Sequence, residues 1–284
     1  MKTFFYTTIA LFAFAGNSVL CRLALGEYAI DAASFTIIRL LSGIFVLAII
    51  IKTVGVKKTS VARGSWKASL MLFIYAVTFS FAYISMETGV GALVLFGSIQ
   101  ITIILASLLE GNKLHRSEWL GLFISFFGLV YLMMPKLGAP SFLGFFLMII
   151  SGCAWGFYTL LGRQSQDPLC DTAYNFFRTL PLVLILLVMT YSYSNLSQEG
   201  IILAILSGGL ASGLGYTIWY MALKGLRTTQ AAVVQLLVPV IAAIGGVVFA
   251  HETISLRLLF SSLAILGGIL VVVLAKDSSS QILD

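Results

Sequence analysis

The sequence predicts an all-α membrane protein with ten transmembrane helices, arranged as two inverted five-helix repeats. The 284-residue chain is 60% hydrophobic and only 10% charged, whereas a soluble domain carries about 25% charged residues. Its apolar segments are each close to the length of about 20 residues that crosses a bilayer as a helix. Landmarks recur about 140 residues apart. Because each half has an odd number of spans, duplication would insert the halves with opposite orientations.

The apolar segments are separated by short polar connectors rich in turn-forming residues. The expected spans are 3–25, 32–51, 66–86, 89–109 and 119–134 in the first half, then 142–161, 172–191, 200–223, 229–249 and 256–275 in the second. A Pro-Lys-Leu-Gly-Ala-Pro segment separates the halves. We therefore expect one five-helix repeat at 1–135, a second at 141–276, and a polar tail at 277–284.

The basic residues of the connectors predict the orientation. Twelve lysines and arginines fall on the side of the N-terminus and three on the opposite side. Cytoplasmic loops carry such an excess, so both termini are expected in the cytoplasm. The net charge of +6 then indicates contact with anionic lipid rather than with nucleic acid.

Two arginines, Arg39 and Arg178, lie inside predicted spans at matching places in the two halves. Each has a polar residue three positions earlier, Thr36 or Asn175, which helical spacing would place beside it. An arginine inside a span is costly and usually faces the bundle interior or a wet cavity. The pair is expected either to attract an anionic group or to bond helix ends and lock a gate; snorkelling to the headgroups is the alternative.

The polar and aromatic residues within the spans form the candidate substrate site. Tyrosine and tryptophan provide apolar walls with one hydrogen-bonding group, and glutamine or asparagine can bind a carboxylate, amine or amide. Such a lining suits a small neutral or zwitterionic molecule. The candidates are Asn17, Tyr75, Ser80, Tyr83, Ser98, Gln100, Trp155, Tyr158, Tyr216, Trp219, Tyr220 and Gln235. The alternatives are an interfacial aromatic belt, favoured for Trp66 and Trp119, and helix-to-helix bonding by the glutamines.

No acidic residue falls in the middle of a predicted span, although proton-coupled carriers commonly use a buried carboxylate. Glu87, just past the third span, is the nearest candidate. We expect facilitated diffusion or exchange, or coupling through Glu87 or through the ionisation of the substrate. Pro239 removes one backbone hydrogen bond from the ninth span and permits a bend there.

Short motifs recur in order along the two halves. They are Gly16-Asn17 and Ala154-Trp155-Gly156 in the first spans, an arginine in each second span, Pro239, His251-Glu252-Thr253-Ile254 and Gly267-Gly268. Together they resemble the drug/metabolite transporter superfamily, specifically its EamA-type bacterial members, over nearly the whole chain. Asn112 departs from the pattern, because the family usually has glutamate there, so a role for that glutamate applies only to Glu252.

The resemblance implies transport of small metabolites, frequently amino acids, through a central cavity lined mainly by the first, third and fourth spans of each half. Arg39 and Arg178 lie on second spans, so a gating or structural role is favoured for them, as for Pro239 and Glu87. We expect a secondary transporter working by alternating access, with export favoured. An uncoupled facilitator or exchanger is the alternative within transport.

Other classes of function lack the residues they need. There is no phosphate-binding Gly-x-x-x-x-Gly-Lys-Ser/Thr loop, and Cys21, Cys153 and Cys170 lack metal or redox spacing. An intramembrane enzyme would need a clustered acid or base beside a nucleophile, and none is present. We expect no enzyme activity, metal or cofactor; the expected partners are a small-molecule substrate and membrane lipid, with the chain a monomer or homodimer.

Overall fold

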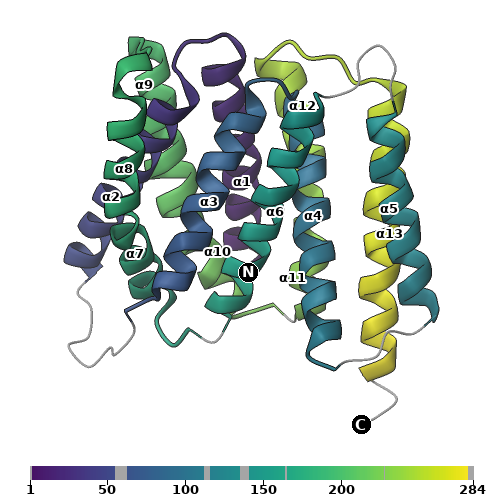
Figure 1. Ribbon diagram of the computed structural model, residues 1–284. Coiled ribbons are helices and arrows are strands. Elements are labelled where there is room, and N and C mark those ends of the chain that lie inside the picture. Colours follow the sequence, from purple (N-terminus) through teal and green to yellow (C-terminus); the bar gives the residue numbers. More distant parts are fainter. Residues whose placement is uncertain are drawn as a thin grey trace.

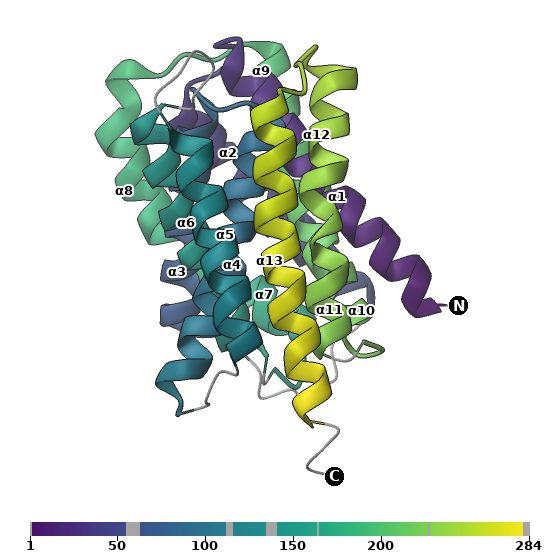
Figure 2. The same ribbon diagram turned by 90° about the vertical axis from the view of Figure 1, so that its right-hand side faces the viewer.

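The chain forms a bundle of helices that run side by side (Figures 1 and 2). The computed structural model describes residues 2–54, 63–111, 116–134, 141–163, 165–226 and 228–280. Across these ranges the regular structure is helical, apart from an isolated bridge between Ile30 and Leu196. The predicted all-α class is therefore confirmed. Asn112, where the sequence departs from the family pattern, lies outside the described residues.

Each helix of the first half corresponds to one predicted span. The five are α1 (Lys2–Gly26), α2 (Ala32–Val54), α3 (Trp66–Tyr83), α4 (Thr88–Leu109) and α5 (Arg116–Met133). Glu118, which we expected in a connector, instead lies buried in the first turn of α5. The fifth span thus begins earlier than its hydropathy indicates.

Three spans of the second half are divided into shorter pieces. The elements are α6 (Phe142–Gly162), α7 (Pro168–Arg178), α8 (Leu180–Thr190), η1 (Tyr191–Tyr193), α9 (Gln198–Ile205), η2 (Leu206–Leu214), α10 (Gly215–Leu223), α11 (Thr228–Gln235), α12 (Leu237–Phe249) and α13 (Leu256–Ser280). Helix α13 continues past the predicted end of its span at 275, so the start of the expected polar tail is helical.

Within the described ranges, nine helical segments are long and apolar enough to cross a bilayer, counting α7 with α8 and α9 with α10. The remaining span is formed by α11 and α12, which are separated at Leu236. Pro239 has no N–H to donate to the carbonyl of Gln235, four residues earlier, and this missing bond explains the break. Ten alternating spans bring both chain ends to the same half of the bundle (Figure 2).

Helices α5 and α13 pack closely together at one edge of the bundle (Figure 1). Gly121 lies against the backbone of Gly268, and the Ser125 hydroxyl donates to the carbonyl oxygens of Gly121 and Ile265. Small residues permit this approach between membrane helices. Gly267, the neighbour of Gly268 in the sequence motif, has open space around it.

The contacts that the first helix of each half makes with the other half occur in matched pairs. Helix α3 packs against α6 as α10 packs against α1, and α4 packs against α6 as α12 packs against α1. Exchanging the first five spans for the last five converts each contact into its partner. An inverted repeat would produce this pattern; the repeat itself stays a prediction.

The element η2 is a π-helix, which packs against α2. Such segments are rare and occur frequently at functional sites. Gly208 lies in it, directly against the backbone carbonyl of Arg39 and the Ser42 hydroxyl. Only glycine permits this approach, which brings η2 against the arginine.

We predict that Gly208→Ala destabilises the protein by about 1–3 kcal/mol, the usual range for overpacking, because its Cβ would overlap the Arg39 carbonyl. Thermal unfolding in detergent measures the effect. Gly267→Ala is the matched control, because a Cβ there meets no atom. Equal midpoints for the two variants would contradict the packing described here.

Candidate functional site

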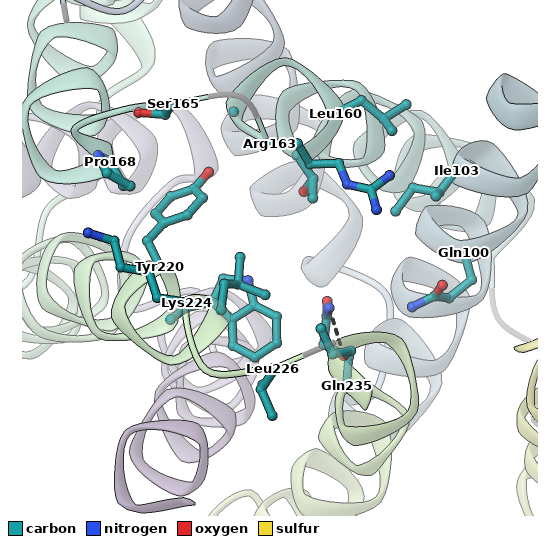
Figure 3. Close-up of a pocket in the computed structure, with 15 residues that line it drawn as sticks. Gln100, Ile103, Leu160, Arg163, Ser165, Pro168, Tyr220, Lys224, Leu226 and Gln235 are labelled. Carbon is teal, nitrogen blue, oxygen red and sulfur yellow. Dashed lines mark hydrogen bonds between the residues drawn. The ribbon is translucent and has the colours of Figure 1, made fainter. Parts of the chain in front are cut away.

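A cavity of about 330 Å³, which we call the vestibule, lies between α4, α6, α10 and α11 (Figure 3). The side chains of Gln100, Arg163 and Gln235 converge on one side of it. Lys224 also lines the vestibule. The lining combines amide groups and cations with aromatic walls, which suits a polar solute with some apolar surface.

Four of the twelve predicted site residues line the vestibule: Gln100, Trp219, Tyr220 and Gln235. Gln235 donates its side-chain amide to the carbonyl of Ala231 in its own helix, at 3.2 Å. That bond is internal to α11, so it does not join Gln235 to another helix.

Four others line a second and deeper space, the deep chamber: Asn17, Tyr75, Trp155 and Tyr216. The chamber measures about 20 Å³, which is room for about one water molecule. A metabolite does not fit into it in this conformation. Its walls come from α1, α3, α4, α6 and α10, so both halves contribute.

An aromatic partition separates the two spaces and consists of Phe14, Trp155, Tyr216 and Trp219. The ring centroids of Trp155 and Tyr216 are 4.6 Å apart, and those of Phe14 and Trp219 are 5.7 Å apart. Trp219 faces the vestibule, whereas the other three line the deep chamber. Tilted and edge-on contacts of this kind stabilise a packed cluster. A solute must displace the partition to pass between the two spaces.

Arg39 lies next to the deep chamber and is 1% exposed. Its Nη2 donates to the hydroxyls of Tyr75 and Tyr216 at 3.1 and 3.4 Å, and its Nε donates to Ser212 in η2 at 3.3 Å. The guanidinium also lies over the ring of Phe79, 4.9 Å from its centroid. Its Nη1 has no hydrogen-bond partner. The arginine therefore joins α2, α3 and the η2–α10 segment through neutral groups.

Arg178 lies in a different environment, although its sequence position matches that of Arg39. It ends α7, is partly exposed, and donates to the backbone carbonyl of Arg63. The rings of Trp66 and Tyr174 lie beside its guanidinium. Matching places in the sequence therefore do not give matching environments, because Arg178 lies at a helix end where a backbone acceptor is within reach.

The polar residues before the two arginines bond elsewhere. The Thr36 hydroxyl donates to the carbonyl of Ala32, and the Asn175 side chain accepts from the N–H of Ser65. Asp171 accepts from the neighbouring N–H of Gly64 at 2.6 Å. Asn175 and Asp171 thus attach α7 to the start of α3, which the spacing of residues did not reveal.

The remaining four predicted residues, Ser80, Tyr83, Ser98 and Tyr158, are buried but line neither space. Ser80 donates to the carbonyl of Ala76 in its own helix, and Tyr83 donates to the carbonyl of Thr88. By contrast, Trp66 and Trp119 are exposed on the outside of the bundle, where the aromatic-belt alternative places them.

At the opposite end of the bundle from the vestibule, an ion pair joins α1 to the segment that follows α12. Arg22 Nε lies 3.1 Å from Glu252 Oε1. Both oxygens of Glu252 also accept from the N–H of Thr88, at 2.9 and 2.8 Å, in the first turn of α4. Arg22 further donates to the carbonyl of Tyr83. We call this cluster the latch, because it ties three helices together across one end of the path.

Sequence reasoning did not identify the latch. In the sequence, Arg22 was counted only among the three basic residues opposite the N-terminus. Glu252 was noted only as part of a motif. The available signal was a carboxylate after one span and an arginine near the end of another, but their 230-residue separation hides the contact. A helix N-terminus favours an anion, and here the start of α4 supplies the N–H that holds Glu252.

Glu87 precedes α4 and stands beside the latch. Partial desolvation and the carboxylate of Glu252 raise the pKa of Glu87, and Arg22 offsets part of the rise. Part of the rise comes from repulsion between Glu87 and Glu252, so protonating Glu87 removes a repulsion within the latch. Glu87 therefore links the latch to pH.

Comparison with known proteins decides the family. A model of the EamA-like transporter family matches residues 142–274. An uncharacterized protein of Pseudomonas aeruginosa is 46% identical over 95% of this chain and 94% of its own length. The chain belongs to the EamA-like transporter family. The predicted family is confirmed, and the protein is a multi-pass membrane transporter rather than an enzyme.

More distant relatives of this transporter have names that state a function. A probable amino-acid metabolite efflux pump of Escherichia coli is 25% identical over 74% of this chain and 76% of its own. An uncharacterized transporter of Archaeoglobus fulgidus is 26% identical over 86% and 87%. A solved crystal structure matches with a TM-score of 0.65 at 18% identity, over 95% of this chain and 97% of that chain; this likeness supports the fold alone.

We predict that Glu252→Gln opens the latch, because glutamine removes the charge that holds Arg22. The readout is the native thiol of Cys21, which is fully buried beside Arg22, in a background with the other two cysteines replaced by serine. An impermeant maleimide added on the latch side is expected to label the variant several-fold faster than the parent. Unchanged labelling would show that the ion pair does not control access.

We predict that labelling of Cys21 slows as the pH falls toward the ordinary glutamate range. Protonating Glu87 removes its repulsion of Glu252, so acid favours the closed latch. Initial rates are normalised at each pH to the unfolded protein, which corrects for ionisation of the thiol. Glu87→Gln is expected to abolish this part of the pH dependence. A pH profile identical to that of the parent would exclude Glu87 as the group responsible.

Proposed function

We propose that this transporter exports small amino-acid-like metabolites across the bacterial inner membrane by alternating access. The observation that carries the proposal is a polar path between the halves that is accessible at one end and closed at the other. The path runs from the vestibule through the aromatic partition and the deep chamber to the latch. Alternating access requires such a pair of barriers on either side of a central site.

The chemistry of the path supports a small zwitterionic or amphipathic cargo. Gln100 and Gln235 provide amide groups in the vestibule, and the partition provides aromatic surface. Side chains with both an apolar body and a hydrogen-bonding group suit molecules of the same mixed character. Amino acids and related compounds have this character at small size.

The predicted topology and the names of two relatives support export as the direction. The charge bias places the ends of α6 and α10, and hence the vestibule, on the cytoplasmic side with both termini. The latch then lies on the external side. A vestibule facing the cytoplasm can load an export cargo, and two relatives are named as probable amino-acid metabolite efflux pumps.

The lining of the vestibule and the deep chamber also bears on whether transport is coupled to protons. No carboxylate lines the vestibule or the deep chamber among the described residues, whereas Arg163 and Lys224 line the vestibule. A buried acid that relays protons along the path is therefore not part of the proposal. Exchange or facilitated transport, modulated at the latch by Glu87, fits these residues. A continuously open pore fits less well, because the partition and the latch both block the path.

We predict that the purified protein in proteoliposomes exchanges radiolabelled neutral amino acids, and that Gln100→Ala or Trp155→Ala lowers the rate at least about tenfold. Loss of a group that binds cargo directly costs on the order of 1–3 kcal/mol. Thermal shift against the same amino acids gives an independent measure of binding.

Trp119→Phe is the matched control, because Trp119 lies on the outer surface of the bundle and its replacement is expected to leave transport unchanged. If Gln100→Ala and Trp155→Ala both transported and bound as well as the parent, the vestibule and partition would not be the cargo path.

A further inference from the structure

We propose that the cargo carries a carboxylate, and that the deep chamber binds this group through Asn17, Tyr75 and Tyr216 with the charge of Arg39 directly behind them. The inference rests on the proposed function, because it names the chemical class of the transported molecule. It goes beyond the proposed function by assigning the anion-binding group. For Arg39 it adopts the alternative of attracting an anionic group in place of the favoured gating or structural role.

The first observation is an uncompensated charge. Arg39 hydrogen-bonds the neutral side chains of Ser212, Tyr75 and Tyr216, whereas Arg22 pairs with the carboxylate of Glu252. A buried cation without an anion is expensive, because desolvation removes far more free energy than neutral hydroxyls return. An anionic ligand would provide the missing charge. Binding of such a ligand would therefore stabilise the protein.

The second observation is that the hydrogen-bonding capacity of Arg39 is incompletely used. Its Nη1 is buried and has no partner, although such groups nearly always have one. The bond from Nη2 to Tyr216 is long, at 3.4 Å. A structural arginine in the same protein differs: Arg22 bonds a carboxylate and a backbone carbonyl. Arg39 is held in place, but the hydrogen-bonding capacity of its guanidinium is not fully used.

The third observation is that the groups meeting at the chamber are donors. Tyr75 Oη has around it Nη2 of Arg39 at 3.1 Å, Nδ2 of Asn17 at 3.4 Å and the Tyr216 hydroxyl at 3.5 Å. The acceptor oxygen of Asn17 is already occupied by the Ser207 hydroxyl at 2.6 Å. The chamber thus presents an amide N–H and hydroxyls supported by a cation. A carboxylate accepts from such groups and is attracted by the charge of Arg39. An ammonium would have to bond tyrosine oxygens that already accept from Arg39, and it would lie beside a like charge.

The long bonds show how a ligand enters this network. Hydrogen bonds of 3.4–3.5 Å between Asn17, Tyr75 and Tyr216 are at the limit of the interaction. A carboxylate can replace them with shorter, charge-assisted bonds. Since the chamber is small in this conformation, Trp155 and Phe14 must move aside as the carboxylate enters. The apolar part of the cargo then lies against the displaced aromatic rings.

The test compares 4-methylpentanoate with 4-methylpentanamide, a pair of matched shape that differs in charge. Isothermal titration of the full-length protein in nanodiscs measures both. The wild type is expected to bind the acid at least about tenfold more tightly than the amide, the usual effect of a charged hydrogen-bond partner. Arg39→Gln is expected to lose this preference. Arg178→Gln, at the matching position of the other half, is expected to keep it.

Tyr75→Phe provides a second variant if Arg39→Gln does not fold, and is expected to weaken binding of the acid more than binding of the amide. An acid preference in the wild type without transport of any amino acid would support the carboxylate site and contradict the proposed cargo. Wild-type protein that shows no acid preference, through equal binding or through no binding, overturns the inference even if amino acids are transported.

Discussion

The arrangement of this transporter depends on one buried cation. Arg39 comes from the first half and bonds Ser212 and Tyr216 from the second, so the two halves meet through it. The π-helical turn of η2 and the absence of a side chain at Gly208 bring the second half close enough for these bonds. Neutral hydroxyls hold the guanidinium without neutralising it. The contact between the halves therefore also places a positive charge beside the path.

Two barriers close the path by different physical means. An ion pair, supported by the start of α4, closes the latch end. Packed aromatic rings separate the vestibule from the deep chamber. The two barriers respond to different conditions, because only the ion pair of the latch responds to pH and to the charge of Glu87. A carrier built in this way can load at the aromatic barrier and release at the polar one.

Much of the fold follows from the sequence, because a bilayer requires apolar segments of nearly fixed length. The site was less predictable. Arg39 and Arg178 occupy equivalent positions in the chain, yet one is buried and the other reaches a backbone carbonyl near a helix end. The difference arises from tertiary packing. The latch was hidden for the same reason, because Arg22 and Glu252 lie in opposite halves of the chain.

The central claim is that the path to Arg39 opens at one end at a time. Its most direct test is a pair of distance measurements by double electron–electron resonance. Spin labels at Glu27 and Ile254 span the latch, and labels at Gln166 and Lys224 span the vestibule, each in a cysteine-free protein in nanodiscs. Adding a transported amino acid should lengthen distances in one pair while shortening them in the other. Distances that lengthen together, or that do not respond, would contradict alternating access.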